Sequence, residues 1–223
     1  MRICYAGIKF FYLNVLKREW HALKLAKAKR EKRLPAVLSR VEVKKIISSV
    51  STFHNYAYLK TVYACGLRLQ EALYLQVSDI DGARNMIHVH RGKGARHRYV
   101  PLASATYKLL QEYWLTHKNS DLIFPAVGRG QNKGHVSKIP MSIEGVQGAF
   151  RRAKFDAGIK KRASIHTLRH SYATHLLEAG VNLRVIQKNL GHSNIETTMV
   201  YLHLTNVGME NAYRIIDSLM AED

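Results

Sequence analysis

Residues 164–180 read SIHTLRHSYATHLLEAG. Apolar side chains recur there at every fourth position, which predicts a helix over about 167–179 that ends near Gly180. They are Leu168, Tyr172 and Leu176. His166 and Arg169 lie three residues apart, so on a helix they project from one face toward one ligand. Both are hydrogen-bond donors, and the pair is therefore a candidate anion site, with a simple surface pair as the alternative.

The same stretch raises the question of a metal. His166 and His170 lie four residues apart, a spacing typical of two zinc ligands on a helix. The glutamate of the H-E-x-x-H motif is absent, however. The sequence therefore predicts neither a metal nor another cofactor at this helix.

Helical signals dominate the rest of the chain. Ser39 and Glu42 form an S-x-x-E capping box, which predicts a helix start, and Ser193 and Glu196 form a second one. Gly191 stands where a helix C-cap is expected. Further helices are predicted over Tyr56–Ala64, ending at Gly66, and over about 103–116, 142–157, 182–190, 194–202 and 207–221.

The region Met86–Val100 differs, because its apolar residues alternate. Ile87 and Val89 are separated by histidines, and Gly92-Lys93-Gly94 follows. This pattern predicts a β-hairpin with a glycine-flanked lysine near its tip. Asp121–Pro125 could supply a third short strand. The expected fold class is mainly α with a small antiparallel β-sheet (α+β).

The composition favours a globular protein that binds polyanions. The 223 residues include 35 Lys+Arg and 16 Asp+Glu, a formal charge of +19, and 47% are hydrophobic. This charge points to nucleic acid or an acidic membrane, and the hydrophobic fraction argues against disorder. Cys4 and Cys65 show no disulfide or zinc spacing, and no stretch approaches the roughly 18 apolar residues of a membrane span. We expect a cytoplasmic protein.

Charge is unevenly distributed along the chain. Residues 1–33 carry ten Lys/Arg and two Glu, a net +8, whereas residues 199–223 carry one Arg and four acidic residues, a net −3. Apolar residues at near-helical spacing predict a basic amphipathic helix over Ile8–Lys29, and Pro35 marks a boundary. We therefore expect a basic helix and linker over 1–33 and a second domain over 34–223. A solvated helix whose charges serve solubility is the alternative for the first segment.

Two further motifs carry candidate chemistry. Arg68 follows Gly66-Leu67 at a helix start, where a guanidinium and free backbone amides can share an anion. A salt bridge to Glu71 is the alternative. Leu190-Gly191-His192 places a histidine just past a helix end, and Tyr201 follows nine residues later. Each motif is weak alone, since tyrosines usually pack in cores.

In combination these motifs resemble the tyrosine recombinase, or phage integrase, family. G-L-R-x-x-E-x-L, a glycine-flanked lysine on a hairpin, H-x-x-R-H, L-G-H and a tyrosine nine residues on occur in order from about Leu34 to the C-terminus, some 85% of the chain. Within the family the chain looks closest to bacterial and integron-type integrases. The resemblance implies a tyrosine recombinase catalytic-domain fold whose catalytic residues are Arg68, Lys93, His166, Arg169, His192 and Tyr201.

The resemblance implies site-specific cleavage and rejoining of double-stranded DNA. The tyrosine would form a 3′-phosphotyrosyl ester, which conserves the energy of the phosphodiester bond without ATP or metal. Arg68 and Arg169 would clamp the phosphorane-like transition state, and His192 would add a hydrogen bond. His166 is the candidate base, and Lys93 would protonate the leaving 5′-oxygen. A type IB topoisomerase-like relaxing enzyme and a DNA-binding remnant without turnover are the alternatives.

Basic residues outside the pocket are expected to contact phosphates and set the register on DNA. They lie on the hairpin and before the H-x-x-R helix: Arg91, Arg96, Arg98, Arg151, Arg152 and Lys154.

The resemblance implies a different role for each end of the chain. Family members carry an N-terminal core-binding domain of several helices, and 1–33 looks like its last helix and linker, so the chain resembles an N-terminally truncated member. A C-terminal exchange helix would dock on a neighbouring protomer in a dimer or tetramer on DNA. Its apolar residues are Val207, Met209, Ile215, Ile216 and Leu219. Packing of this helix on its own domain is the alternative.

Overall fold

The computed structural model describes residues 2–18, 20, 34–90, 97–127, 133–205, 213 and 216–218. The chain divides into two compact units, Met1–Arg33 and Leu34–Asp223, and each is described by itself. None of the described helices is long and apolar enough to cross a membrane.

The first unit contains helix α1, Arg2–Asn14. The predicted helix Ile8–Lys29 is therefore wrong at its start and is broken at Asn14, while residues 21–29 lie outside the described residues. The amides of the two residues after Asn14 both donate to the carbonyl of Phe11, and Lys17 has a φ of 51°. This left-handed residue turns the backbone out of the helix. Apolar residues keep near-helical spacing in the sequence beyond Asn14, but residues 15–18 are not helical.

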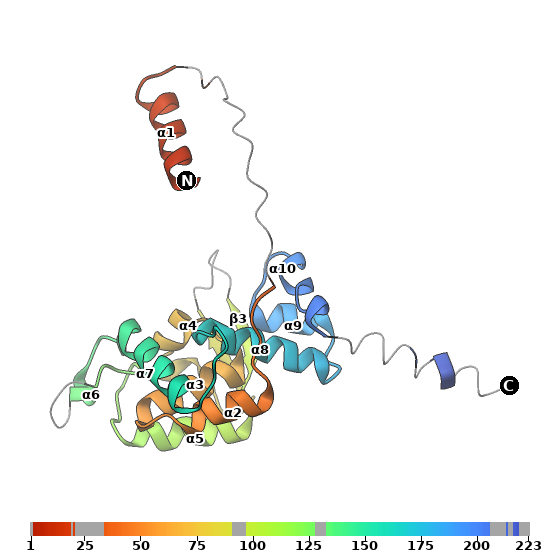
Figure 1. Cartoon of the computed structure of the whole chain (residues 1–223). Coiled ribbons are helices and arrows are strands. Elements are labelled where there is room, and N and C mark those ends of the chain that lie inside the picture. The colour runs from red at the N-terminus through yellow and green to blue at the C-terminus, as the bar shows by residue number, and fades with distance from the viewer. Residues whose placement is uncertain are drawn as a thin grey trace. The chain divides into compact units, whose positions relative to one another are not determined.

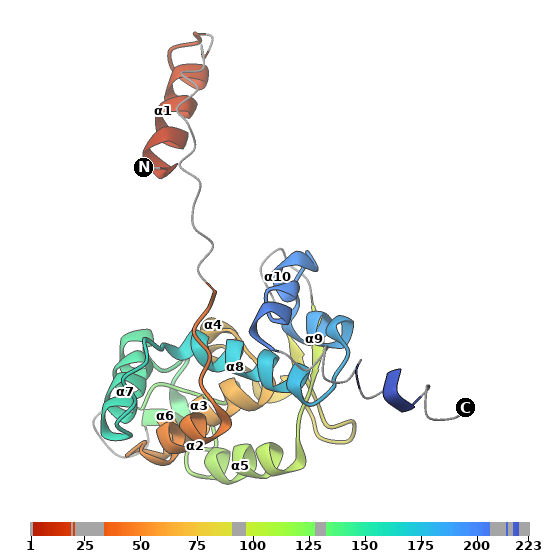
Figure 2. The same ribbon diagram turned by 45° about the vertical axis from the view of Figure 1, so that its right-hand side comes forward.

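The second unit is mainly helical. Its α-helices are α2 (Arg40–Ser48), α3 (Phe53–Cys65), α4 (Leu69–Leu73), α5 (Ser104–Leu115), α6 (Lys133–Val136), α7 (Ile143–Asp156), α8 (Ile165–Glu178), α9 (Leu183–Leu190) and α10 (Glu196–Met199), and its 3-10 helices are η1 (Val77–Asp79) and η2 (Leu202–Leu204). Helix α8 packs between α3 and α9, as both ribbon views show (Figures 1 and 2). It begins two residues before the predicted start, so His166 lies in its first turn.

Most of the predicted helix signals are confirmed. The Ser39–Glu42 capping box is present at α2, and Gly66 and Gly191 end α3 and α9 with left-handed backbones. The box predicted at Ser193 and Glu196 is wrong. The side chain of Asn194 accepts the Glu196 amide hydrogen instead, because it lies two residues before that amide, as a local Asx turn requires. Within the predicted helix 207–221, residues 213 and 216–218 are helical. The others lie outside the described residues, so the extent of this helix stays a prediction.

A three-stranded antiparallel sheet, ordered β1-β2-β3, holds the predicted hairpin. Its strands are β1 (Ile80–Asp81), β2 (Met86–Val89) and β3 (Arg98–Pro101), with His88 opposite Tyr99 and Val89 opposite Arg98. The prediction that Asp121–Pro125 supplies the third strand is wrong. Leu122 and Pro125 form only single bridges outside the sheet, because proline lacks the amide hydrogen that continued pairing requires.

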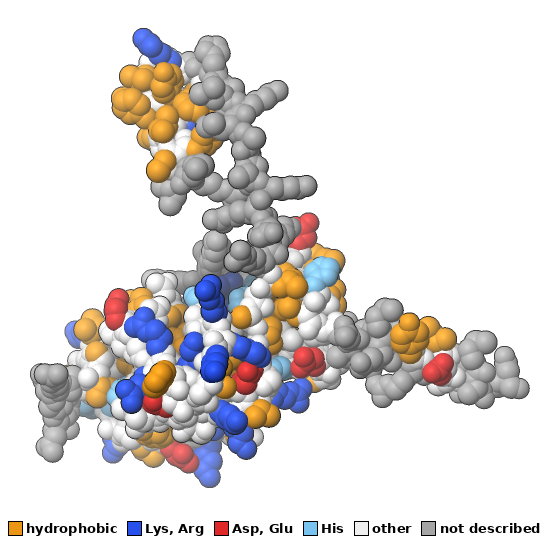
Figure 3. All heavy atoms as spheres, in the orientation of Figure 1, with side chains coloured by type: hydrophobic (Ala, Val, Ile, Leu, Met, Phe, Trp, Pro, Cys, Tyr) orange, Lys and Arg blue, Asp and Glu red, His pale blue; other side chains and the backbone are white. Residues whose placement is uncertain are grey.

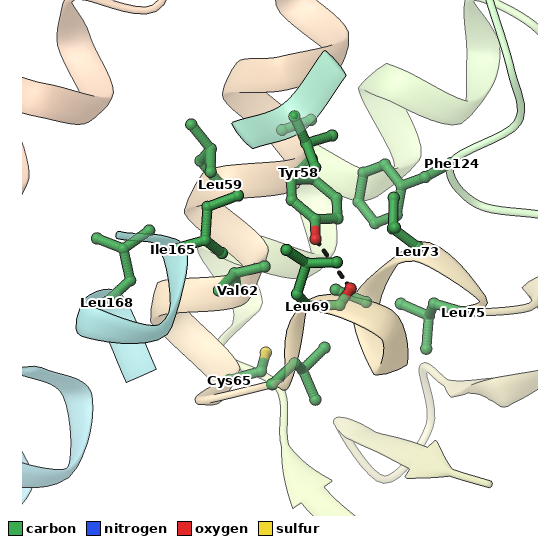
Figure 4. Close-up of a cluster of buried hydrophobic side chains, with 14 of the residues drawn as sticks. Tyr58, Leu59, Val62, Cys65, Leu69, Leu73, Leu75, Phe124, Ile165 and Leu168 are labelled. Atoms are coloured by element: carbon green, nitrogen blue, oxygen red, sulfur yellow. Dashed lines mark hydrogen bonds between the residues drawn. The ribbon is translucent and has the colours of Figure 1, made fainter. Parts of the chain in front are cut away.

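Two apolar clusters meet along α8. The larger one lies between α3, α8 and the sheet, and Figure 4 shows part of it, with Tyr58 donating to the Leu69 carbonyl at 2.9 Å. The smaller one consists of Ala173, Ile186, Leu190 and Tyr201. Leu168 of α8 belongs to the first cluster and Ala173 of α8 to the second. Helix α8 therefore joins the body of the domain to the segment that carries Tyr201.

Candidate active site

Three arginines converge on the C-terminal end of α9. Arg98 Nε donates to the carbonyl of Asn189 at 2.8 Å, Arg169 Nη2 to that of Leu190 at 2.6 Å, and Arg68 Nη2 to that of Gly191 at 3.4 Å. The last carbonyls of a helix lack intrahelical partners and carry the negative end of its dipole. The three arginines come from the start of α4, from β3 and from α8, so one helix end fixes guanidinium groups from three distant parts of the sequence.

Glu71 is the common anion of these arginines. Its side chain is 6% exposed and lies 2.6 Å from Arg68 Nη1, 2.6 Å from Arg98 Nη2 and 3.7 Å from Arg169 Nη1. Burial pushes the pKa of Glu71 upward, but hydrogen bonds and charges from Arg98 and Arg68 outweigh it and lower the pKa to about 2. We call Glu71 and its three arginines the Glu71 cluster. The salt bridge that competed with an anion site at Arg68 is thus present, and it positions Arg68 beside the candidate site.

Two glycines allow these contacts. Gly66 has φ +58° and its carbonyl accepts from Arg169 Nη1 at 2.6 Å. Gly191 has φ +64°, and a Cβ there would lie 2.8 Å from Arg98 Cδ. Only glycine combines a left-handed backbone with this close approach. The glycines of the G-L-R and L-G-H motifs therefore shape the arginine cluster.

His192 is held in one tautomer. Arg169 Nη2 lies 3.3 Å from His192 Nε2, and His192 Nδ1 lies 2.9 Å from Thr198 Oγ1. A guanidinium can only donate, so Nε2 accepts and the ring proton resides on Nδ1. Burial, assisted by the charges of Arg169 and Arg68, lowers the pKa of His192 to about 4. The imidazole is therefore neutral at pH 7.

Tyr201 lies beside these groups but is packed in the smaller apolar cluster. The residue is 1% exposed, and its hydroxyl lies 3.0 Å from His170 Nδ1. Burial raises the pKa of Tyr201, although Arg169 and Arg68 act against it. Burial also lowers the pKa of His170. The two groups therefore share a hydrogen bond as a protonated phenol and a neutral imidazole.

An open cleft of about 1150 Å³ runs past the exposed side of the Glu71 cluster. Arg68, whose side chain is 28% exposed, and His166 both line it, together with Ile143 and Gln147 of α7. Arg169 is 5% exposed, is not among the residues that line the cleft, and contacts the same Glu71 carboxylate as Arg68. The cleft therefore offers a guanidinium and an imidazole to an anion, and a second guanidinium supports the first.

A family model for the phage integrase family matches residues 36–207. The chain belongs to the phage integrase family. It is 36% identical over 205 residues to an integrase/recombinase of Sinorhizobium fredii, covering 92% of this chain and 64% of that protein. It is 33% identical over 222 residues to tyrosine recombinase XerC of Halalkalibacterium halodurans, covering 93% of this chain and 72% of that one. The chain thus spans about two thirds of the length of these relatives.

Solved structures agree on the fold of this member of the family. The XerA recombinase is 29% identical, with a TM-score of 0.68 over 94% of this chain and 72% of its own. The XerH recombinase, bound to a palindromic difH substrate after cleavage, is 24% identical, with a TM-score of 0.73 over 97% of this chain and 66% of its own. Both support the α+β recombinase catalytic fold that the sequence predicts.

The structure brings together most of the residues that the family resemblance singles out. Arg68, Arg169, His192 and Tyr201 are linked through the contacts above, and His166 shares the cleft with Arg68. Lys93, like the predicted DNA contacts Arg91 and Arg96, lies outside the described residues.

Sequence reasoning missed the position of His170. It considered His170 only as a zinc ligand and chose His166 as the partner of the tyrosine, yet the hydroxyl of Tyr201 lies on His170. The signal was available, since H-x-x-R-H contains both histidines. Only packing distinguishes the one that faces the cleft from the one that faces the apolar cluster.

The predicted phosphate contacts divide into exposed and buried residues. Arg98 does not fit its expectation, because its side chain is 6% exposed and bound to Glu71. In a strand, alternate residues face opposite sides, and Arg98 shares the inward face with Val100. Arg151 is exposed; Arg152 is exposed and pairs with Asp156 at 3.0 Å. Lys154 donates to a backbone carbonyl at 2.9 Å. Figure 3 shows many Lys and Arg side chains, with scattered acidic ones, over the face that α2 and α7 share.

Proposed function

We propose that this phage integrase cleaves and rejoins double-stranded DNA at specific sites through a 3′-phosphotyrosyl intermediate formed by Tyr201. The observation that carries the proposal is the Glu71 cluster, which holds Arg68 and Arg169 beside both His192 and the tyrosine. The names of the relatives, integrase and recombinase, favour recombination over topoisomerase-like relaxation.

The geometry supports phosphoryl transfer without a metal or nucleotide. A backbone phosphate in the cleft would accept hydrogen bonds from Arg68 and His166, and the charge that develops on its non-bridging oxygens would fall within reach of Arg169. The tyrosine oxygen would bond to phosphorus as the 5′-oxygen leaves with a proton, for which Lys93 is the proposed donor. Attack by a new 5′-hydroxyl reverses these steps and restores the hydroxyl of the tyrosine.

The tyrosine has to leave its apolar cluster before it can react. Its hydroxyl lies on His170, and the residue is 1% exposed, whereas the cleft is open. We propose that DNA binding shifts the segment α10–η2 and delivers the hydroxyl to the phosphate. The candidate base depends on which histidine the hydroxyl faces. Before the shift this is His170, and on the cleft side it is His166.

The partners follow from the same proposal. Double-stranded DNA would lie along the cleft and over Arg151, with affinity that falls as salt rises. Self-association into a dimer or tetramer on DNA, through the C-terminal segment of net negative charge, stays a prediction. The assignment of 1–33 as a remnant of a core-binding domain also stays a prediction, as does a cytoplasmic location.

Covalent trapping tests the proposed chemistry. A pool of nicked suicide duplexes with randomised sequence is incubated with the chain at low salt, and covalent adducts are separated on a denaturing gel. We expect an adduct for the unchanged chain and none for Tyr201→Phe, because only the phenol can form the ester. Tyr201→Phe removes a single hydrogen bond, so its folding stability falls by only about 1 kcal/mol.

Tyr213→Phe is the matched control, since Tyr213 is 62% exposed and follows closely in the sequence. It should form the adduct as the unchanged chain does. Lack of any adduct at low salt, or an adduct that persists in Tyr201→Phe, would refute the proposal. Sequencing the trapped strands would also reveal the preferred site, and joining of two such sites would separate a recombinase from a relaxing enzyme.

A further inference from the structure

Three histidines gather on the solvent side of the sheet, where β2 and β3 lead into residues 91–96. They are His88, His90 and His97, which we call the hairpin histidine cluster. One ring nitrogen from each lies within 4.8 Å of the others. The ring centroids of His88 and His90 are 3.9 Å apart, and those of His90 and His97 are 5.5 Å apart.

Strand geometry explains this grouping. His88 lies on β2 and His90 directly follows its last residue, Val89, so both face the side opposite Val89. The register pairs His88 with Tyr99 and Val89 with Arg98, and its continuation places His97 opposite His90. The other side of the same strands carries Arg98 to Glu71. The cluster is therefore built by the sheet and makes none of the arginine contacts described above, although His90 and His97 line the same cleft as Arg68.

A buried carboxylate contacts one member of the cluster. Asp79, at the end of η1, has a side chain that is 4% exposed, and its Oδ1 lies 2.6 Å from His90 Nε2. Its Oδ2 accepts the backbone amide hydrogen of Gln76 at 2.9 Å. Oδ1 has no aligned hydrogen-bond donor among the described residues, and the approach of His90 does not supply one. A buried carboxylate oxygen without a donor is costly unless a cation satisfies it.

We propose that the hairpin histidine cluster binds one Zn²⁺ and that the Asp79 carboxylate orients His90 from the outer sphere. Three imidazole nitrogens with a fourth position open to water form a tetrahedral donor set that suits zinc. Ligand atoms around tetrahedral zinc lie about 3.3 Å apart, from metal–nitrogen bonds of about 2.0 Å. The three ring nitrogens need only small side-chain rotations from their present separations. His90 and His97 are exposed, so the ion and the side chains can reach each other.

The consequence would be a cross-link between two strand ends. His90 and His97 flank residues 91–96, and a shared ion would tie β2 and β3 together at that point. Lys93, the proposed acid, lies between these two histidines in the sequence. The ion would therefore limit the distance between the two ends of the segment that carries it. This site takes no part in the bond-making steps above, so it goes beyond the proposed function.

Calorimetric titration of the tag-free, chelator-treated chain with ZnCl₂ tests the site. We expect one zinc per chain. His97→Asn should weaken binding by more than the roughly 10- to 100-fold that loss of an outer-sphere partner costs. His135→Asn is the matched control, because His135 is an exposed histidine of α6 outside the cluster, and its affinity for zinc should be unchanged.

Two further measurements guard against misfolding and stray binding. The metal-free His97→Asn chain should unfold at the same temperature as the unchanged chain, since the side chain is exposed, whereas added zinc should raise the unfolding temperature of the unchanged chain alone. Co²⁺ should give the intense visible bands of a tetrahedral site, and Asp79→Asn should alter them. Absence of a zinc equivalent, or unchanged affinity in His97→Asn, would overturn the proposal. Neither result depends on DNA cleavage.

Discussion

The Glu71 cluster and the apolar cluster around Tyr201 share helices α8 and α9 but are held by different forces. In the first, Arg68, Arg98 and Arg169 are fixed by one carboxylate and by successive carbonyls at the end of α9. In the second, the tyrosine packs against small and aliphatic side chains and makes one hydrogen bond to His170. Charged hydrogen bonds are directional, whereas apolar contact is not.

This difference assigns separate tasks to the two clusters. A pocket that stabilises charge works best when its donors are already oriented, and the Glu71 cluster orients them without DNA. The proposed nucleophile, Tyr201, can be kept protonated and buried by contacts that a shift of α10 can exchange for others. In the proposed mechanism the anion-binding half is thus already assembled, while the hydroxyl of Tyr201 is still held on His170.

Removing the carboxylate of the Glu71 cluster should have the largest effect on folding stability. Glu71→Gln removes the anion that three arginines share and leaves uncompensated buried charge, so the free energy of unfolding should fall by about 3 to 5 kcal/mol. Urea denaturation monitored by circular dichroism measures it.

Asp156→Asn is the control for this prediction. It removes the partner of Arg152 in a surface pair whose side chains are 77% and 36% exposed, and its cost should stay within about 0 to 1 kcal/mol. Equal effects of the two substitutions would show that the Glu71 cluster does not depend on its buried carboxylate.

Acid should weaken the Glu71 cluster and its neighbour His192, in two separate pH windows. The pKa of His192 is about 4 when folded and 6.5 as an ordinary histidine, so the unfolded chain binds the proton more readily and stability is lost as the pH falls from 6.5 toward 4. Glu71 has a pKa of about 2 against 4.5, and its contribution, complete above pH 4.5, is lost toward pH 2. Denaturation at pH 7, 5.5, 4 and 3 samples both windows, and His192→Asn should remove the loss of stability between pH 6.5 and 4. A stability that rises between pH 7 and pH 5 would contradict it.

The smallest effect is expected from an exposed cation beside the cleft. Arg151 follows Ile143 and Gln147 at four-residue intervals on α7, and both of those line the cleft. Arg151→Ala should lower the slope of log affinity for DNA against log salt by about 0.9 for one lost phosphate contact, and should leave the unfolding temperature unchanged. Lys108→Ala on α5, which contributes no residue to the cleft, should alter neither quantity. An unchanged slope for Arg151→Ala would remove α7 from the DNA interface.

The sequence predicted the local features of this fold well. The hairpin, the capping box at Ser39 and the glycine ends of α3 and α9 depend on residues within a few positions of each other. It failed where the outcome depends on remote partners. Arg98 looked like its neighbours on a basic hairpin, and only its pairing with Glu71, 27 positions away, buries it.

By itself the sequence determined which side chains were available, namely the motifs, their order and the family they indicate. Tertiary structure decided what each one faces. It placed His170 rather than His166 on the hydroxyl of Tyr201, turned Arg98 inward, and brought three hairpin histidines together, one of them against a buried aspartate. The physical reason is that capping and periodicity are short-range, whereas burial and charge pairing are set by segments that meet only when the chain packs.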